Sequence, residues 1–410
     1  GNDFSNGFRP RGGADIIDGR GGYDRVDYRD EANTDPDADG FVVTASIDAA
    51  GSGTARDASG ALDQLTSIEW LRGSNFNDSL AAQGFGGVTF GAYTLNYNNT
   101  PALEGRQGSD TLTGEAGDYV IVRYTSNEGG AYVDLAGGFA IDEWGFRDTL
   151  TNVWGVYTGS GDDTILLGPG DGWARPGDGT DHVDGGAGID RVSYDGAPAG
   201  VVVDLAAGTA QDGWGNIDTL IGIEALTGSG FDDTLLGDAN ANWFYGGAGN
   251  DTIDGRGGID TAFYFYLTTQ GAFVDLTAGT ATTGSGNDTL VSIENVIGSS
   301  FSDSIVGAAG DNALYGYLGD DSLAGLAGND LLDGGDGTDT ADYSQAASRV
   351  VVNLTIEGAQ NTVGAGTDTL VSIETVLGSA FNDTLTGNDA SNGFFGGNGT
   401  DLVVSNATPA

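Results

Sequence analysis

Single apolar residues recur every nine residues along most of the chain. In the stretch 246–254, a Gly-rich hexad ends in Asp251, and a three-residue tail follows with Ile253 at its centre. The same frame elsewhere places Leu235 and Leu323 at the centre of the tail. Glycine permits the backbone angles of a tight turn, and the tail alternates like a strand with one inward side chain. The pattern therefore predicts tight turns joined by three-residue strands.

The nonapeptide frame can be followed through several runs. These begin at Gly228 (continuing at Gly237, Gly246 and Gly255), at Gly298 (continuing at Gly307, Gly316, Gly325 and Gly334), at Gly378, at Thr158 (through Leu167 and Pro176 to Gly185), at Gly105, at Gly73 in degenerate form, and at Gly1, Pro10 and Gly19.

A second recurring element of roughly 35 residues separates these runs. It opens with a Tyr (Tyr28, Tyr194, Tyr264 and Tyr343), continues with an apolar run such as 201–205, and ends in Asp-x-Leu-x-x-Ile-Glu. From that Asp to the Asp of the next nonapeptide there are always 15 residues, as in 63 to 78 and 218 to 233. The apolar runs predict longer strands in the same stack.

A three-residue strand is not stable alone, so neighbouring turns must stack into a ladder. The sequence predicts an all-β fold, a parallel β-roll or β-solenoid of stacked nonapeptide turns with longer strand spacers. The predicted divisions are an N-terminal run (1–27) and five repeat units, at 28–122 (with an insertion near 83–104), 123–193, 194–263, 264–342 and 343–410.

Charge limits the partners of this chain. Its 410 residues include 60 acidic and 14 basic residues, a net charge of -46, together with 74 Gly and no Cys. Such a surface repels nucleic acid and anionic membranes, whereas it attracts small cations. Without Cys there are no disulfides, so a metal is the natural stabiliser. No apolar run is long enough to span a bilayer as a helix, and no signal peptide is recognisable.

The pattern G-G-x-G-x-D-x-U-x resembles the repeat of the RTX, or hemolysin-type calcium-binding, family of secreted bacterial proteins, with near-complete matches at 185–193, 246–254 and 325–333. The resemblance implies a right-handed β-roll with several calcium ions between stacked turns, bound by carboxylates at the sixth position and by backbone carbonyls. Calcium prefers such oxygen ligands. The implied ligands are Asp15, Asp24, Asp78, Asp110, Asp163, Asp181, Asp190, Asp233, Asp251, Asp260, Asp303, Asp321, Asp330, Asp339, Asp383 and Asp401.

Some frames depart from the pattern at the sixth position. Asn occupies it at Asn6, Asn242, Asn312 and Asn392, which should weaken those sites, and full sites are not expected at Gly87, Gly172 or Tyr119. Two questions stay open at this point. The Gly- and Asp-rich turns could be metal-free corners, and the spacer acids Glu69, Glu224, Glu294 and Glu374 could bind ions or have a structural role.

Candidate catalytic residues are scarce. The only His is His182, which we expect at the surface, and neither H-E-x-x-H nor G-x-S-x-G occurs. The six Trp residues could form a sugar-binding stripe, although packing roles are the more common use. They are Trp70, Trp144, Trp154, Trp173, Trp214 and Trp243.

We therefore expect no enzyme, but a calcium-binding structural or adhesive protein of the cell surface, in a surface layer, a filament or an adhesin stalk. As the RTX resemblance implies, it would be exported by a type I system and would fold on calcium outside the cell. The alternative is the repeat module of a secreted enzyme, such as a polysaccharide lyase or epimerase, a protease or a lipase, with its catalytic domain outside this chain. Because Gly1 starts in mid-repeat and neither end shows a cap, we expect a fragment or processed product that associates head to tail. Cell-surface polysaccharide is the other expected partner.

Overall fold

A computed structural model describes residues 1–31, 41–83, 88–90, 93–95, 100–126, 129–267 and 269–404. These residues form strands and turns without any helix, and so include no helix that could cross a membrane. The chain forms two compact units. The first consists of Gly1–Ala197 with Gly208–Ile223, and the second of Pro198–Ala207 with Glu224–Ala410.

Two sheets, called A and B, build the first unit. In spatial order, sheet A contains β1 (Gly7–Phe8), β3 (Arg25–Asp27), β7 (Trp70–Arg72), β11 (Ala102–Glu104), β13 (Ile121–Tyr124), β17 (Gly155–Thr158), β19 (Trp173–Arg175) and β21 (Arg191–Ser193). Sheet B contains β2 (Ile16–Asp18), β6 (Leu62–Thr66), β5 (Gly53–Arg56), β4 (Val43–Ile47), β8 (Asp78–Ala82), β12 (Thr111–Thr113), β16 (Arg147–Thr151), β15 (Phe139–Ile141), β14 (Tyr132–Asp134), β18 (Thr164–Gly168), β20 (His182–Gly186), β24 (Ile217–Ile221) and β23 (Thr209–Gln211). A separate antiparallel hairpin, β9 (Val88–Phe90) and β10 (Tyr93–Leu95), lies in the predicted insertion.

The second unit has corresponding sheets. Its sheet A contains β25 (Ala225–Thr227), β27 (Trp243–Tyr245), β29 (Thr261–Phe263), β33 (Asn295–Ile297), β35 (Ala313–Tyr315), β37 (Leu331–Asp333), β41 (Thr367–Val371) and β40 (Gln360–Asn361). Its sheet B contains β22 (Val202–Asp204), β26 (Thr234–Leu236), β28 (Thr252–Asp254), β32 (Asn287–Val291), β31 (Thr280–Thr282), β30 (Phe273–Asp275), β34 (Ser304–Val306), β36 (Ser322–Ala324), β38 (Thr340–Asp342), β42 (Thr375–Leu377) and β44 (Gly393–Phe395). Strands β39 (Val351–Asn353), β43 (Thr384–Thr386) and β45 (Leu402–Val404) form a third, parallel group.

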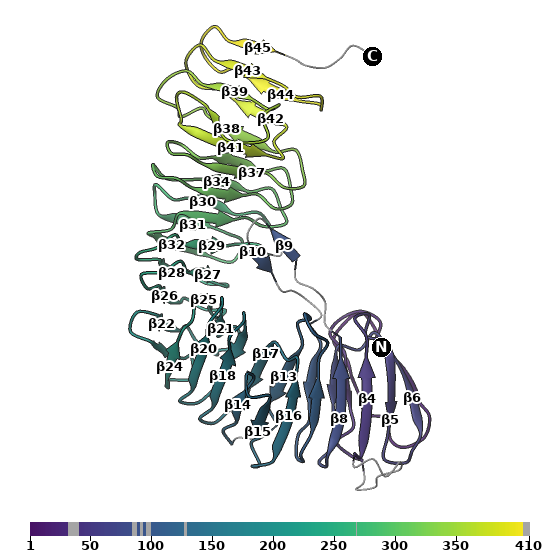
Figure 1. The fold of residues 1–410 in the computed structure, drawn as a ribbon. Helices are drawn as coiled ribbons and strands as arrows, with labels where there is room; N and C mark the ends of the chain where they lie inside the picture. The colour runs from purple at the N-terminus through teal and green to yellow at the C-terminus, as the bar shows by residue number, and fades with distance from the viewer. Residues whose placement is uncertain are drawn as a thin grey trace. The chain divides into compact units, whose positions relative to one another are not determined.

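Successive nonapeptides alternate between the two sheets, so two of them make one coil of 18 residues. In β26 and β28, Leu235 lies beside Ile253 in parallel register, and both side chains are buried. The coil strands in each unit are stacked in the order of the chain (Figure 1). Apolar side chains from both sheets thus fill the space between them, and the predicted parallel β-roll is confirmed.

The spacers join the same stack, but with an antiparallel course. In 273–291 the chain runs through β30, β31 and β32 as a three-stranded meander. Its last strand, β32, pairs in parallel with the preceding β28, and its first strand, β30, pairs with the following β34. The apolar positions are the same for parallel and antiparallel pairing, so the sequence predicted the strands but not this reversal.

The number of coil strands between two meanders determines the sheet in which the second meander lies. Five coil strands, β25 to β29, precede the meander β30–β32, which lies in sheet B. Six, β33 to β38, precede the last meander, and its β41 pairs with β37 in sheet A. The additional strand comes from the additional nonapeptide in the run that begins at Gly298.

Candidate metal centres

The sixth-position Asp residues form a ladder along the corners of the roll. The backbone N–H of Asp303 donates a hydrogen bond of 2.7 Å to Oδ1 of Asp321, and the N–H of Asp321 donates one of 2.8 Å to Oδ1 of Asp339. Each bond joins equivalent corners one coil apart. The same bond is received by Asp181 from Asp163, by Asp251 from Asp233, by Asp260 from Asn242, by Asp330 from Asn312 and by Asp401 from Asp383.

The second carboxylate oxygen of most ladder residues is buried without a donor. Among the described residues, nine of the predicted ligands have an Oδ2 atom that receives no hydrogen bond. They are Asp24, Asp110, Asp163, Asp181, Asp251, Asp260, Asp321, Asp330 and Asp339. A buried carboxylate oxygen without a partner is costly, so these corners lack a positive charge or a donor.

Backbone carbonyl oxygens lie at the same place as these free carboxylate oxygens. A Cβ atom added to Gly316, the first residue of its nonapeptide, would be 2.2 Å from Oδ2 of Asp321 and 2.5 Å from the carbonyl oxygen of Gly334. Gly316 leaves this space because it has no Cβ atom. The described part of the chain contains no cluster of three or more Asp, Glu, His or Cys side chains suited to a metal, so a cation here needs carbonyl ligands as well.

Burial and mutual repulsion act together on the ladder. Burial, and then the charges of Asp303 and Asp339, raise the pKa of Asp321 to about 7. Burial, and then Asp218 and Asp163, raise that of Asp181 to about 8. Without a cation the ionised corners are therefore unfavourable in the folded chain. Carboxylate and carbonyl oxygens around a glycine space fit calcium, which would supply the missing positive charge.

Comparison with known families agrees with this geometry. The RTX calcium-binding nonapeptide repeat family matches residues 102–121, 156–174, 175–192, 227–262, 297–332, 315–344 and 371–403. The chain carries several copies of the RTX calcium-binding nonapeptide repeat. RTX repeats bind several calcium ions, and proteins that carry them are generally secreted. No curated protein matches the sequence.

Four predicted RTX ligands have their oxygens satisfied by a serine instead. In the nonapeptide that follows the spacer, the N–H of Ser229 donates 2.6 Å to Oδ2 of Asp233, and its hydroxyl donates 2.8 Å to Oδ1. Ser74, Ser299 and Ser379 bind their own Asp in the same way. The corners of Asp78, Asp233, Asp303 and Asp383 thus fit a metal less well than the nine with a free oxygen. The repeated G-S-x-F-x-D signature is visible in the sequence.

The three remaining predicted ligands differ in exposure. Asp190 is buried, whereas Asp15 and Asp401 are only half-buried. The role of each of the sixteen residues as a calcium ligand stays a prediction. Gly87, one of the degenerate frames, lies outside the described residues.

The Asp of each spacer motif also belongs to the ladder, which the sequence did not reveal. Oδ1 of Asp218 accepts the N–H of Asp181 at 3.0 Å, and its Oδ2 accepts the hydroxyl of Tyr194 at 2.8 Å. The same Tyr–Asp pair occurs in Tyr28 with Asp63, Tyr124 with Asp148 and Tyr343 with Asp368. At these corners the hydroxyl of a buried tyrosine donates to the Asp Oδ2 atom, which has no donor at the nine corners described above. Tyr and Asp are 24 or 25 residues apart in three of these four pairs, and this recurring distance was the available signal.

The spacer glutamates continue the ladder at the opposite corners. Oε2 of Glu294 accepts the N–H of Asp260 at 2.9 Å, as Glu374 does for Asp339 and Glu69 for Asp24. At the equivalent corner of the next coil, the residue is Asn312. Its side-chain amide donates a hydrogen bond of 2.7 Å to the backbone carbonyl of Glu294. At Asn312, and at Asn242 beside Glu224, the amide thus avoids placing a second negative charge beside the glutamate.

In the first unit, one stretch of this ladder contains no acidic residue. Gly172 stands at the sixth position, as expected. Trp154 occupies the place of the spacer glutamate. Its backbone N–H donates to the carbonyl of Val120 at 2.8 Å, just as the backbone N–H of Glu294 donates to the carbonyl of Asp260. Val120, rather than Tyr119, is thus the residue at the ladder position of the Gly114 frame. One additional residue in this turn shifts the register.

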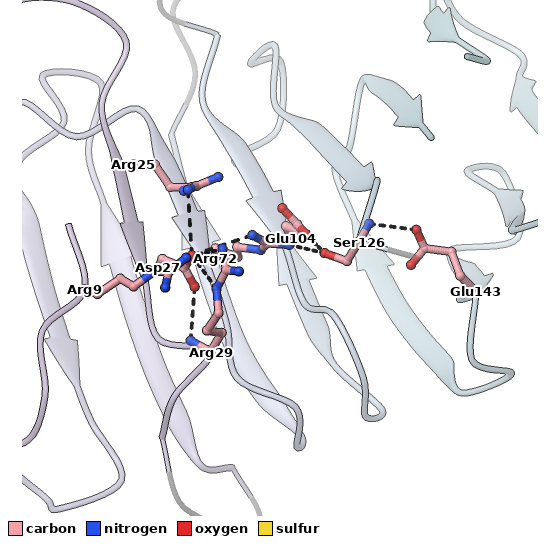
Figure 2. Close-up of polar contacts among 8 residues, drawn as sticks. All are labelled: Arg9, Arg25, Asp27, Arg29, Arg72, Glu104, Ser126 and Glu143. Atoms are coloured by element: carbon pink, nitrogen blue, oxygen red, sulfur yellow. Dashed lines mark hydrogen bonds and ion pairs between the residues drawn. The ribbon is translucent and has the colours of Figure 1, made fainter. Parts of the chain in front are cut away.

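A cluster of ion pairs lies in sheet A of the first unit. Figure 2 shows Arg9, Arg25, Arg29 and Arg72 around the buried carboxylate of Asp27, which they contact through Oδ2. Arg72 also pairs with Glu104 at 2.9 Å. Burial alone would raise the pKa of Asp27, but hydrogen bonds from Arg29 and the charge of Arg72 outweigh burial and lower it.

The Trp residues differ in their surroundings. The guanidinium groups of Arg25 and Arg123 stack on Trp70 at 4.7 and 4.2 Å from the ring centre, so Trp70 has a packing role. Trp243 packs against Phe263. Trp144 and Trp214 lie in turns of the meanders.

Replacing Tyr194 by Phe should destabilise the calcium-loaded protein, because it leaves Oδ2 of Asp218 buried without a donor. The expected loss in free energy of unfolding is about 1–3 kcal/mol, measured by thermal or denaturant unfolding at saturating calcium. The control is Tyr132→Phe, since Tyr132 is exposed. Equal stability of the two variants would contradict a role for the Tyr–Asp pair.

Proposed function

We propose that this chain is a calcium-folded structural or adhesive protein that acts at the cell surface, in a surface layer, a filament or an adhesin stalk. The observation that carries the proposal is the ladder of buried Asp residues with a free oxygen, in a chain of net charge -46. In the cytosol, where calcium is scarce, repulsion keeps the chain open for export. Millimolar calcium outside the cell neutralises the corners and closes the roll.

The proposal assigns no catalytic role to the chain. Its only histidine, His182, lies half-buried in β20 beside the ladder residue Asp181, where its position fits a structural residue. Partners of a surface protein of this kind are further copies of itself, arranged head to tail, or a polysaccharide of the cell surface.

Circular dichroism at pH 8 tests the folding step. The chain should be unfolded in excess chelator and β-rich in millimolar calcium, whereas magnesium at the same concentration should fold it poorly, because magnesium requires a small octahedral site. Light scattering of the calcium-loaded sample then tests the assembly step. A β-rich spectrum that chelator leaves unchanged would refute calcium-driven folding, and a monodisperse monomer in millimolar calcium would refute the head-to-tail role.

A further inference from the structure

The acid-free stretch of the ladder coincides with a cavity in the first unit. The cavity has a volume of about 600 Å³, and its lining includes Asp118, Tyr119, Trp154 and Asp171. Trp154 stands where other spacers have a glutamate, and the adjoining Gly172 stands where other nonapeptides have an Asp. Across these coils, the ladder positions therefore carry an indole and a glycine in place of acidic side chains. The volume lies in the range of small-molecule sites.

Aromatic rings form one part of this cavity. The rings of Tyr119 and Trp154 are 5.0 Å apart and nearly perpendicular, and the indole of Trp173 lies almost parallel to that of Trp154 at 6.3 Å. Such side chains combine a flat apolar surface with a polar end. The indole Nε1–H of Trp154 is buried and has no acceptor within the protein. A ligand here thus meets an aromatic, largely apolar surface.

Carboxylates form the other part. Asp171 is exposed, and its Oδ1 already accepts the N–H of Ile189 at 2.9 Å, which fixes the carboxylate at the rim. Asp118 also belongs to the cavity lining. Two carboxylates repel an anion and accept hydrogen bonds from hydroxyl groups. A neutral sugar fits both parts of the cavity, because its ring has apolar C–H faces and its hydroxyls donate hydrogen bonds.

We propose that this cavity binds a neutral hexose unit of a glycan, with Trp154 as the apolar surface and Asp171 as an acceptor for sugar hydroxyls. The proposal gives the adhesive role a ligand class, and it rests on the proposed function only in that calcium must first fold the roll. Where the ladder lacks acid, the scaffold presents a sugar site in place of a calcium site.

The test uses the full chain in millimolar calcium with methyl β-D-glucoside, methyl β-D-galactoside and methyl α-D-mannoside as probes, and with tetramethylammonium and glucuronate as charged comparisons. Saturation-transfer NMR and titration should show binding of at least one hexoside, weakened tenfold or more by Trp154→Ala and measurably by Asp171→Asn. Trp214→Ala is the matched control, because Trp214 is an exposed Trp of the same unit.

Circular dichroism of each variant separates a folding defect from a binding defect. If the wild-type chain does not fold in calcium, the proposed function fails. If it folds and binds none of the hexosides, or binds them equally in Trp154→Ala and Trp214→Ala, the sugar site is refuted. If Trp154→Ala does not fold, unchanged binding in the exposed-site variant Asp171→Asn refutes it instead. Binding of tetramethylammonium in place of the hexosides would overturn it in favour of a cation site.

Discussion

The calcium-free chain should fold when it is acidified from pH 8 to pH 5. In the folded chain, burial first and neighbouring carboxylates second raise the pKa of Asp181 to about 8 and those of Asp251 and Asp321 to about 7. In the unfolded chain these groups keep ordinary values near 3.8. Between about pH 4 and 8, the folded state therefore binds more protons than the unfolded state, so stability falls as the pH rises through this window.

Circular dichroism in excess chelator measures this transition, with a β-rich spectrum expected at pH 5 and its loss by pH 8. Calcium-loaded protein is the comparison, and it should respond in the opposite direction, because protons compete with calcium for the same carboxylates. A chelated chain that is equally disordered at both pH values would show that repulsion between ionised corners is not what prevents folding.

Asp321→Asn should have opposite effects with and without calcium. With calcium, it removes one charge and one candidate ligand oxygen between Asp303 and Asp339, so the calcium midpoint for folding should rise several-fold and the number of bound ions should fall. Without calcium, it relieves repulsion in the ladder, so the acid-induced fold should persist to higher pH. Isothermal titration and circular dichroism measure the two effects.

The matched control is Asp389→Asn, which makes the same change of charge at an exposed position of the same unit. This control should leave both the calcium midpoint and the pH midpoint nearly unchanged, because exposed charges are screened. If Asp321→Asn destabilised the chain equally with and without calcium, Asp321 would be a hydrogen-bonding corner rather than a calcium ligand.

The sequence predicted the roll because its signal is local and periodic. Each tail has one inward residue, and Leu235 and Ile253 are buried as predicted. The antiparallel meanders were not predicted, because a three-residue strand with one central apolar residue is compatible with either direction. Direction depends on the turn, such as the one at Gly279, where φ is +67°.

The candidate site was predicted at the level of residue type but not of hydrogen bonding. The nonapeptide register identified Asp233 and Asp251 alike, yet Ser229 satisfies the first while Oδ2 of the second has no donor. The distinction depends on a serine four residues earlier. The ladder role of Asp218 depends on pairing with Asp181, 37 residues away, which no local pattern specifies.

The alternation of nonapeptides between the two sheets has a consequence for how such chains diverge. Gain or loss of a single nonapeptide turns everything that follows by half a coil, so later meanders and loops change sides. Gain or loss of a pair leaves every side chain on its original face. Duplications that preserve a working surface must therefore come in even numbers, and an odd one, as in the run from Gly298, presents the next segment to the opposite side.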